Sequence, residues 1–165
     1  MPNKKFTDAI AMLKADHRTV EDLFAQFESA KGSSRKEKLA RQICKELKIH
    51  TTLEEEIFYP AFRGKVDDDT LDEAYVEHDG AKVLVNDIEA ASPSDDFFDA
   101  KISVLAEEVK HHVKEEERAK EGMFAQCRET DVDLVDLRDR LMARKQELLE
   151  MDALPVAELR TLQLT

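Results

Sequence analysis

Four amphipathic segments dominate this sequence, and histidine or glutamate interrupts the apolar stripe of each one. Apolar residues recur three and four positions apart within each segment, which is the spacing of one face of an α-helix. Such a stripe packs into the core of a protein. The feature that most restricts the fold is therefore a helical core with polar side chains at its centre.

Start and stop signals set the expected bounds of these helices. We expect helices over residues 7–30, 34–63, 69–90 and 95–127, and a shorter one over 131–150. Thr7 is the expected N-cap of the first, a capping box begins at Ser34, and Ser94 precedes the fourth. Short connections between long helices favour an antiparallel up-down four-helix bundle, which is an all-α fold.

The length of 165 residues fits one domain with a distinct C-terminal part. We expect residues 1–128 to form the bundle. Residues 129–165 are then a C-terminal helical extension that packs on the bundle or joins a partner chain, for example in a homodimer. The tail after Met151 contains Pro155 and leaves room for one helical turn.

Composition excludes several classes of function and location. The chain has only 4 Gly and 4 Pro, too few for a β-sandwich or barrel. Its net charge of −12 opposes binding to nucleic acid. It has no apolar run long enough to span a membrane and no apolar signal segment at the N-terminus. We interpret Cys44 and Cys127 as reduced thiols, and we expect a cytoplasmic protein.

The polar interruptions lie at matching depths along the four helices. In an up-down bundle, one interrupting residue of each helix lies eight to ten residues from the same end of the bundle. This is roughly 12–15 Å along the helix axis. Two pairs are spaced His-x3-Glu, and this spacing puts both side chains on one helical face. The six interrupting residues are His17, His50, Glu54, His78, His112 and Glu116.

A buried cluster of this composition needs compensation. Burying an unpaired carboxylate or imidazole costs several kcal/mol, and a bound cation offsets that cost. Four imidazoles and two carboxylates suit two first-row divalent metals, with two imidazoles on each and the carboxylates as bridges. Iron or manganese fits this mixed donor set best, and zinc fits less well. We predict these six residues as metal ligands.

The neighbours of these residues leave alternatives open. His111 with Glu115 has the same spacing as His112 with Glu116, but Ile102, Leu105 and Val109 form a stripe with His112. We therefore expect His111 at the surface or behind the ligands. We also expect solvent-exposed or supporting roles for a group of further carboxylates, namely Glu55, Glu56, Glu115 and Glu117. Cys44 lies off the stripe and is expected to be a small packing residue.

These residues resemble the hemerythrin-like, or HHE cation-binding, family. The resemblance rests on ADHRTVEDLF around His17, IHTTLEEEIFYP around His50 and Glu54, VEHDGAK around His78, and KHHVKEEE around His112 and Glu116. It covers about residues 7–128. It implies a four-helix bundle around a non-haem di-iron centre, with two oxo- or hydroxo-bridged iron ions held by these six residues.

The sequence departs from the oxygen-carrying members in two places. Where they have a second histidine one turn after the third-helix histidine, this chain has Lys82. Where they end with histidine and aspartate, it has His112 and Glu116. The four-His, two-Glu set is closer to members linked to iron sensing, oxidative or nitrosative stress, and iron–sulfur repair. Where the family usually closes this segment with Phe-Pro, the chain has Phe124-Ala125, which predicts a longer or looser end.

Three hypotheses for function follow. The first is a di-iron protein that binds or senses O2, NO or peroxide; whether it is an enzyme stays open. The second is a non-catalytic iron sensor or store, in which metal regulates a partner contact through the fifth helix. The third is a helical interaction protein with a hydrogen-bonded polar core. For the first, we expect Phe24, Phe27, Ile57 and Phe58 as pocket walls, with Tyr59 and Lys82 near the site.

Overall fold

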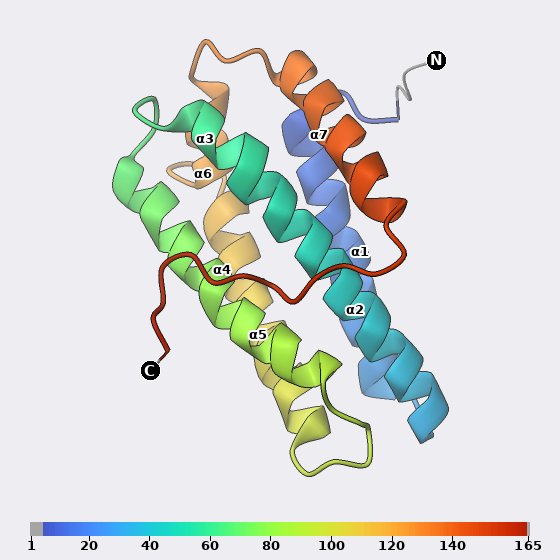
Figure 1. The fold of residues 1–165 in the computed structure, drawn as a ribbon. Coiled ribbons are helices and arrows are strands. Elements are labelled where there is room, and N and C mark those ends of the chain that lie inside the picture. Colours follow the sequence, from blue (N-terminus) through green and yellow to red (C-terminus); the bar gives the residue numbers. More distant parts are fainter. Residues whose placement is uncertain (1–4, 165) are drawn as a thin grey trace.

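The four long helices form the expected antiparallel bundle. A computed structural model of the chain describes residues 5–164, and no strand occurs among them. The helices of the bundle are α1 (Ala9–Ser29), α2 (Ser33–Leu53), α4 (Asp68–Glu89) and α5 (Phe98–Glu117). Each packs on its neighbours in the order α1, α2, α4, α5 and back to α1, and Figure 1 shows them side by side. The all-α bundle is confirmed.

Aspartates cap three of the helices. Asp8, one residue later than the expected Thr7, accepts a hydrogen bond from the Ala11 amide over 2.9 Å at the start of α1. Asp67 caps α4 in the same way, and Asp133 caps α7 (Leu134–Leu149). The expected capping box at Ser34 is wrong, because α2 follows Gly32 without a side-chain cap. These caps satisfy amides that have no partner within the helix.

The second predicted helix is not regular over its whole length. It widens into one π-helical turn, η1 (Glu54–Phe58), before the short α3 (Tyr59–Phe62). The amide of Tyr59 bonds to the carbonyl of Glu54, five residues back. Pro60 follows directly, and a proline both lacks an amide donor and clashes with the carbonyl four residues earlier. The wider turn accommodates this ring, and π-turns of this kind often occur at functional sites.

The fourth predicted helix ends ten residues early. It starts at Phe98 rather than Asp95, stops at Glu117, and is followed by a loop and the short α6 (Met123–Arg128). The loop needs Gly122, because a Cβ atom there would clash with the carbonyl of Arg118. The chain therefore turns back over the end of the bundle instead of continuing along it.

The core is divided into two apolar clusters by the polar layer. One cluster lies around the start of α1, η1, α3, α6 and α7, and includes Leu13, Phe62 and Leu141. The other lies around the second half of α1, the middle of α2, the end of α4 and the start of α5, and it includes Phe27 and Leu105. Cys44 belongs to the second cluster and Cys127 to the first, and both are buried free thiols. The predicted ligands lie between the two clusters.

The C-terminal part packs on the outside of the bundle. Helix α7 lies against α1, α2 and η1. Residues 151–164, which we call the strap, contain no helix. The helical turn that the sequence allows after Met151 does not form. The strap crosses α2 and α4 (Figure 1). No helix among residues 5–164 is long and apolar enough to cross a lipid bilayer.

Candidate metal centre

The fold brings all six predicted residues together in one buried layer. His17 comes from α1, His50 from α2, His78 from α4, and His112 from α5. Glu54 is the first residue of η1, and Glu116 lies one turn after His112. No side chain of the six exposes more than about a tenth of its surface. Alternate helices supply the two His-x3-Glu pairs, as the spacing predicts.

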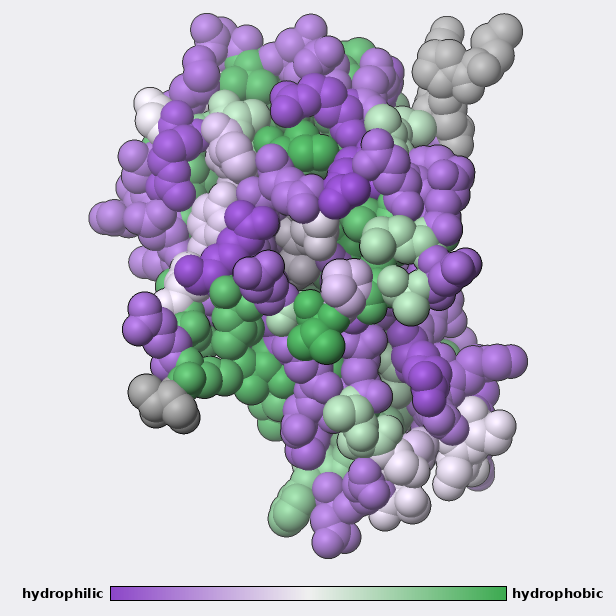
Figure 2. Space-filling view, in the orientation of Figure 1, coloured by the Kyte–Doolittle hydropathy of each residue, from purple (hydrophilic) through white to green (hydrophobic). Residues whose placement is uncertain are grey.

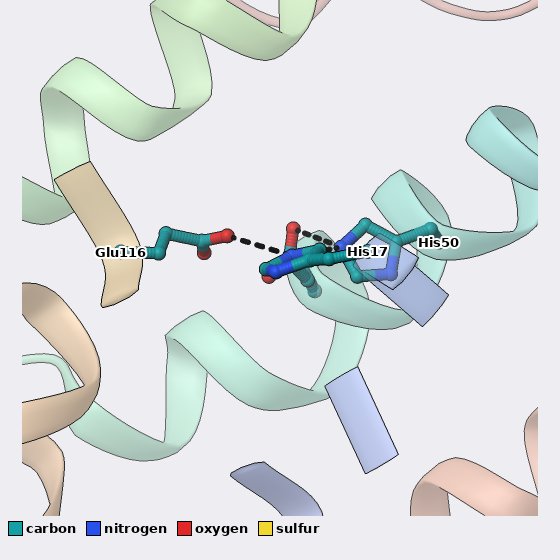
Figure 3. A group of neighbouring side chains, drawn as sticks. His17, His50 and Glu116 are labelled. Carbon is teal, nitrogen blue, oxygen red and sulfur yellow. Dashed lines mark hydrogen bonds and ion pairs between the residues drawn. The ribbon is translucent and has the colours of Figure 1, made fainter. Parts of the chain in front are cut away.

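The four imidazoles meet in two pairs through their Nε2 atoms. The Nε2 atoms of His17 and His50 lie 3.2 Å apart, and those of His78 and His112 lie 3.1 Å apart. At most one proton can lie between two nitrogens at this distance. Figure 3 shows His17 next to His50, with Glu116 reaching His17 from the other side. Pairs of converging nitrogens are the arrangement that imidazole ligands adopt around a metal ion.

Two carboxylates join the pairs. Oε1 of Glu54 lies 3.1 Å from Nε2 of both His50 and His78, so this side chain belongs to both halves. Oε1 of Glu116 lies 3.2 Å from Nε2 of His17 and of His112. Each half of the centre, His17 with His50 and His78 with His112, therefore contacts both carboxylates.

The cluster leaves two buried oxygen atoms without a hydrogen bond. These are Oε2 of Glu54 and Oε1 of Glu116, and they are the only such side-chain atoms found in residues 5–164. The imidazoles beside Glu116 are close enough for attraction but lack the geometry of a hydrogen bond. An unpaired buried carboxylate oxygen is costly. Carboxylate oxygens without a hydrogen bond, next to converging imidazole nitrogens, form a set of electron-pair donors that fits cations.

A second carboxylate supports each histidine from outside. The Nδ1 atoms of His17 and His50 contact Glu117 at 2.6 Å and Asp16 at 3.2 Å. In the other half, Nδ1 of His78 contacts Glu55 at 2.8 Å, and Nδ1 of His112 contacts Glu77 at 2.8 Å. When the proton of the imidazole lies on Nδ1, the lone pair of Nε2 is free to bind a metal ion. The carboxylate that accepts a hydrogen bond from Nδ1 also fixes the orientation of the ring.

The sequence pattern identifies only half of these outer carboxylates. Glu55 and Glu117 support His78 and His17, in line with one of the roles expected for them, whereas Glu56 and Glu115 pair with arginines at the surface. Asp16 and Glu77 were missed. Each directly precedes a predicted ligand in the sequence, and that adjacency is the only signal they carry. His111 is 66% exposed and contacts Glu77 from outside, so the choice of His112 for the core is confirmed.

Tyr59 lies at the centre of the cluster. Its hydroxyl donates to Glu116 over 2.9 Å and lies 3.2 Å from Glu54 Oε1. The same oxygen is 3.2 Å from Nε2 of His78 and 3.3 Å from Nε2 of His112. The π-turn produces this contact, because the extra residue rotates Tyr59 onto the face of Glu54. Burial and the two neighbouring carboxylates raise the pKa of Tyr59, so the phenol keeps its proton at neutral pH.

Mutual attraction shifts the pKa values of the ligands themselves. Burial opposes the charged form of His50, but Glu54 and Asp16 outweigh it and raise its pKa to about 10. The pKa of Glu54 falls well below its ordinary value, because the surrounding imidazoles outweigh burial. In the absence of cations, protons on imidazoles thus neutralise part of the carboxylate charge. Metal binding has to displace those protons.

Aromatic residues close one side of the centre. Phe124 of α6 stacks on the His17 ring with centroids 5.9 Å apart, and it also contacts Phe58. The early end of α5 makes this possible, because α6 turns back over the site. Phe58 packs in this aromatic layer and does not line the pocket described next.

A small cavity adjoins the imidazoles on the opposite side. Its volume is about 40 Å³, and all four ligand histidines line it. Half of the other lining residues are aliphatic, namely Val20, Leu47, Ala81, Val85, Val109 and Val113. The other half are polar or charged, namely Asp16, Lys48, Thr51, Glu77, Lys82 and Glu108. The prediction of Phe24, Phe27, Ile57 and Phe58 as pocket walls is wrong. Phe24 and Phe27 lie about two and three turns beyond His17 along α1, and Ile57 and Phe58 lie beyond Glu54 in η1.

Lys82 occupies a different role from a ligand. Its Nζ atom contacts Glu55 Oε1 at 2.8 Å and donates to the carbonyl of Glu158 over 2.9 Å. The side chain therefore lies behind His78, among the outer carboxylates. It is connected to His78 through Glu55, and it also lines the cavity described above.

The fold and the site define a helical bundle with a buried histidine-rich cluster, in which two carboxylates contact both pairs of imidazoles. Comparison with known proteins agrees, because the sequence profile of the hemerythrin HHE cation binding domain matches residues 8–124. The chain therefore belongs to the hemerythrin HHE cation-binding family. Proteins of this family bind metal cations, and the clusters of His17, His50, Glu54 and Glu116 and of Glu54, His78 and His112 are suited to that.

Two known proteins are similar to this chain. The crystal structure of a hemerythrin HHE cation binding domain-containing protein, the Rv2633c homolog from Mycobacterium kansasii, superimposes with a TM-score of 0.72 at 22% identity, covering 86% of each chain. A protein of Nostoc sp. strain PCC 7120 named DNA nickase is 32% identical over 106 residues. That match spans 64% of this chain but only 30% of the nickase.

Proposed function

We propose that this protein is a non-haem di-iron protein that binds or senses a small ligand such as O2, NO or peroxide. The observation that carries the proposal is the position of the small cavity against all four imidazoles. One water molecule needs roughly 10–15 Å³ of such volume, so about 40 Å³ admits a diatomic molecule or peroxide and little more. Larger organic substrates do not fit into this cavity.

The proposed ligands are the six residues that the sequence pattern predicts, in two halves. His17 and His50 would hold one ion and His78 and His112 the other, with Glu54 and Glu116 shared. Mixed imidazole and carboxylate donors favour iron or manganese over calcium or magnesium, which prefer oxygen alone. Iron in such a site supplies reversible redox chemistry and an open position for a small ligand.

The protein's own residues would set what happens at that position. The aliphatic half of the walls excludes bulk water and gives an uncharged ligand an apolar path to the imidazoles. Tyr59 holds a proton on the opposite side of the centre, between Glu54 and Glu116. It can donate this proton as a hydrogen bond when charge builds up on a neighbouring oxygen. The outer carboxylates keep the imidazoles oriented throughout.

A direct test is reconstitution with Fe²⁺ under anaerobic conditions, followed by metal analysis and exposure to NO, O2 or hydrogen peroxide. We expect two iron ions per chain and a change in the visible absorption spectrum with at least one ligand. Binding of less than one iron per chain would overturn the proposal. Two bound ions with no spectral response to any of the three ligands would favour the second candidate below.

The second candidate is a non-catalytic iron sensor or store in iron homeostasis. The observation in its favour is that the C-terminal part of the chain contacts the carboxylates around the centre, so that metal occupancy and the C-terminal part can affect one another. It predicts that iron changes the melting temperature or the oligomeric state. DNA nicking is not proposed, because the net charge of −12 opposes contact with phosphates.

A further inference from the structure

Two basic side chains of the C-terminal part reach carboxylates that support the ligand histidines. Lys145 projects from α7, and Arg160 projects from the strap. Neither residue falls within the matched family region, residues 8–124. Each one contacts the outer carboxylate of a different half of the centre, which makes the two contacts comparable.

Lys145 acts on the half that contains His50. Its Nζ atom donates to Oδ1 of Asp16 over 2.8 Å, and Oδ2 of Asp16 contacts Nδ1 of His50 at 3.2 Å. Asp16 is 7% exposed. One carboxylate therefore connects a cation of α7 to a proposed metal ligand on α2.

Arg160 acts on the half that contains His78. Its Nε atom lies 2.8 Å from Oε1 of Glu55, and Oε2 of Glu55 lies 2.8 Å from Nδ1 of His78. Glu55 is 2% exposed. The same carboxylate also contacts Lys82, so two cations hold it in place behind the imidazole.

The strap holds Arg160 firmly enough for this contact to matter. The buried carboxylate of Asp79 accepts hydrogen bonds from the backbone amides of three successive strap residues, Arg160, Thr161 and Leu162. Asn86 and the backbone of Ala157 exchange two further hydrogen bonds of 2.9 Å. Arg160 therefore bonds to α4 through its backbone and to η1 through its side chain, and so it joins the helix that carries His78 to the turn that carries Glu55.

Ordinary surface ion pairs contribute little to stability, typically about 0–1 kcal/mol. These two pairs differ because the carboxylates are buried and each has its second oxygen on a ligand imidazole. Loss of Lys145 removes the lysine that holds Asp16, and loss of Arg160 leaves Lys82 to hold Glu55, so each carboxylate is held less firmly against its imidazole. Losing the outer carboxylate itself typically costs about 10–100-fold in metal affinity, and we expect loss of the cation behind it to cost the lower part of that range.

We propose that Lys145 and Arg160 are positioning residues of the metal centre, which fix His50 and His78 through Asp16 and Glu55. The C-terminal part of the chain thus completes the supporting shell that the four bundle helices begin. This inference rests on the proposed metal centre. It assigns the two halves of the centre to two separate segments, α7 and the strap.

The test compares Lys145→Met and Arg160→Gln with the wild type in anaerobic Fe²⁺ titrations against a competing chelator. We expect each substitution to weaken one of the two iron equivalents about tenfold and to leave the other within about twofold. Arg144→Gln is the matched control, because Arg144 neighbours Lys145 but pairs with Glu56 and Glu147. Equal affinities in all four proteins would overturn the proposal.

The NMR signals of the histidine rings in the metal-free proteins provide a second measurement. A residue that only stabilised the fold would not shift the ring signals of one particular histidine. Arg160→Gln should shift the ring signals of His78 and leave those of His50 unchanged, and Lys145→Met should do the reverse. Arg160→Lys should restore the His78 signals in part. If the wild type binds no iron, the proposed function fails, while these ring signals still decide whether Lys145 and Arg160 position the imidazoles. Unchanged signals in both variants would overturn the inference.

Discussion

The hydroxyl of Tyr59 donates a hydrogen bond of 2.9 Å to Glu116, although the two residues lie 57 positions apart in the chain. This bond crosses the bundle from the second helical segment to the fourth. It also places the one phenol of the cluster between the two carboxylates that both halves of the centre share. The hydroxyl of Tyr59 thereby contacts both shared carboxylates and the two imidazoles of one half, His78 and His112.

Tyr59→Phe should destabilise the metal-free protein. The substitution removes the hydroxyl that donates to Glu116 and contacts Glu54, and an unsatisfied buried acceptor costs about 1–3 kcal/mol. We expect the free energy of unfolding in urea to fall by that amount. Tyr75→Phe is the control, since the Tyr75 hydroxyl donates only to a backbone carbonyl at 3.3 Å and is partly exposed. Equal losses in the two variants would contradict the central role of Tyr59.

His112→Ala and His111→Ala should differ in metal content although they alter adjacent residues. His112 supplies an Nε2 atom to the centre, whereas His111 is 66% exposed and contacts only Glu77. We expect His112→Ala to lose at least one iron per chain by elemental analysis and His111→Ala to keep both. Circular dichroism checks that both remain helical. The reverse pattern would assign the ligand role to His111.

Filling the cavity should weaken ligand binding. Val109 lines the cavity, and Val109→Leu adds a methylene group to a space of about 40 Å³. Overpacking costs about 1–3 kcal/mol, so we expect the affinity of the iron-loaded protein for NO to fall about tenfold. Val104→Leu on the same helix is the control, because Val104 is 51% exposed. Unchanged affinity in Val109→Leu would mean that the ligand enters elsewhere.

The two thiols should be inert in the native protein. Burial, with smaller contributions from nearby carboxylates, raises the pKa of both Cys44 and Cys127 to about 12. Only the thiolate is reactive, and a pKa raised by three units lowers its fraction about a thousandfold at pH 8. We expect negligible labelling by a thiol reagent at pH 8 and two labels per chain in 6 M guanidinium. Fast native labelling would show that these sites open.

The helical bundle and the six central residues could be predicted from the sequence for one reason. An apolar stripe fixes which face of a helix is buried, so His50 or His78 on that stripe has to lie in the core. Matched depth then follows from helix length. The same reasoning separates His112 from His111, because only one of two adjacent residues can lie on the stripe.

The supporting residues could not be predicted in the same way, because they depend on features that the stripe does not record. Tyr59 reaches the centre only through the π-turn, which inserts one residue into the periodicity. Asp16 and Glu77 lie beside the stripe, and each becomes an outer partner only when the neighbouring helix is in place. Phe124 covers His17 because the chain turns back at Gly122, and a helical pattern alone does not show that turn.

The strap has a thermodynamic consequence. The strap is held to α4 mainly by hydrogen bonds, while its Val156 and Leu164 remain 74% and 71% exposed. On the face seen in Figure 2, patches of apolar surface lie along the path of the strap. Heat-capacity changes come mostly from the exposure of buried apolar surface. Detachment of the strap from Val156 onward would therefore change the heat capacity only slightly, and amide hydrogen exchange at Arg160, Thr161 and Leu162 is the measurement that would detect it.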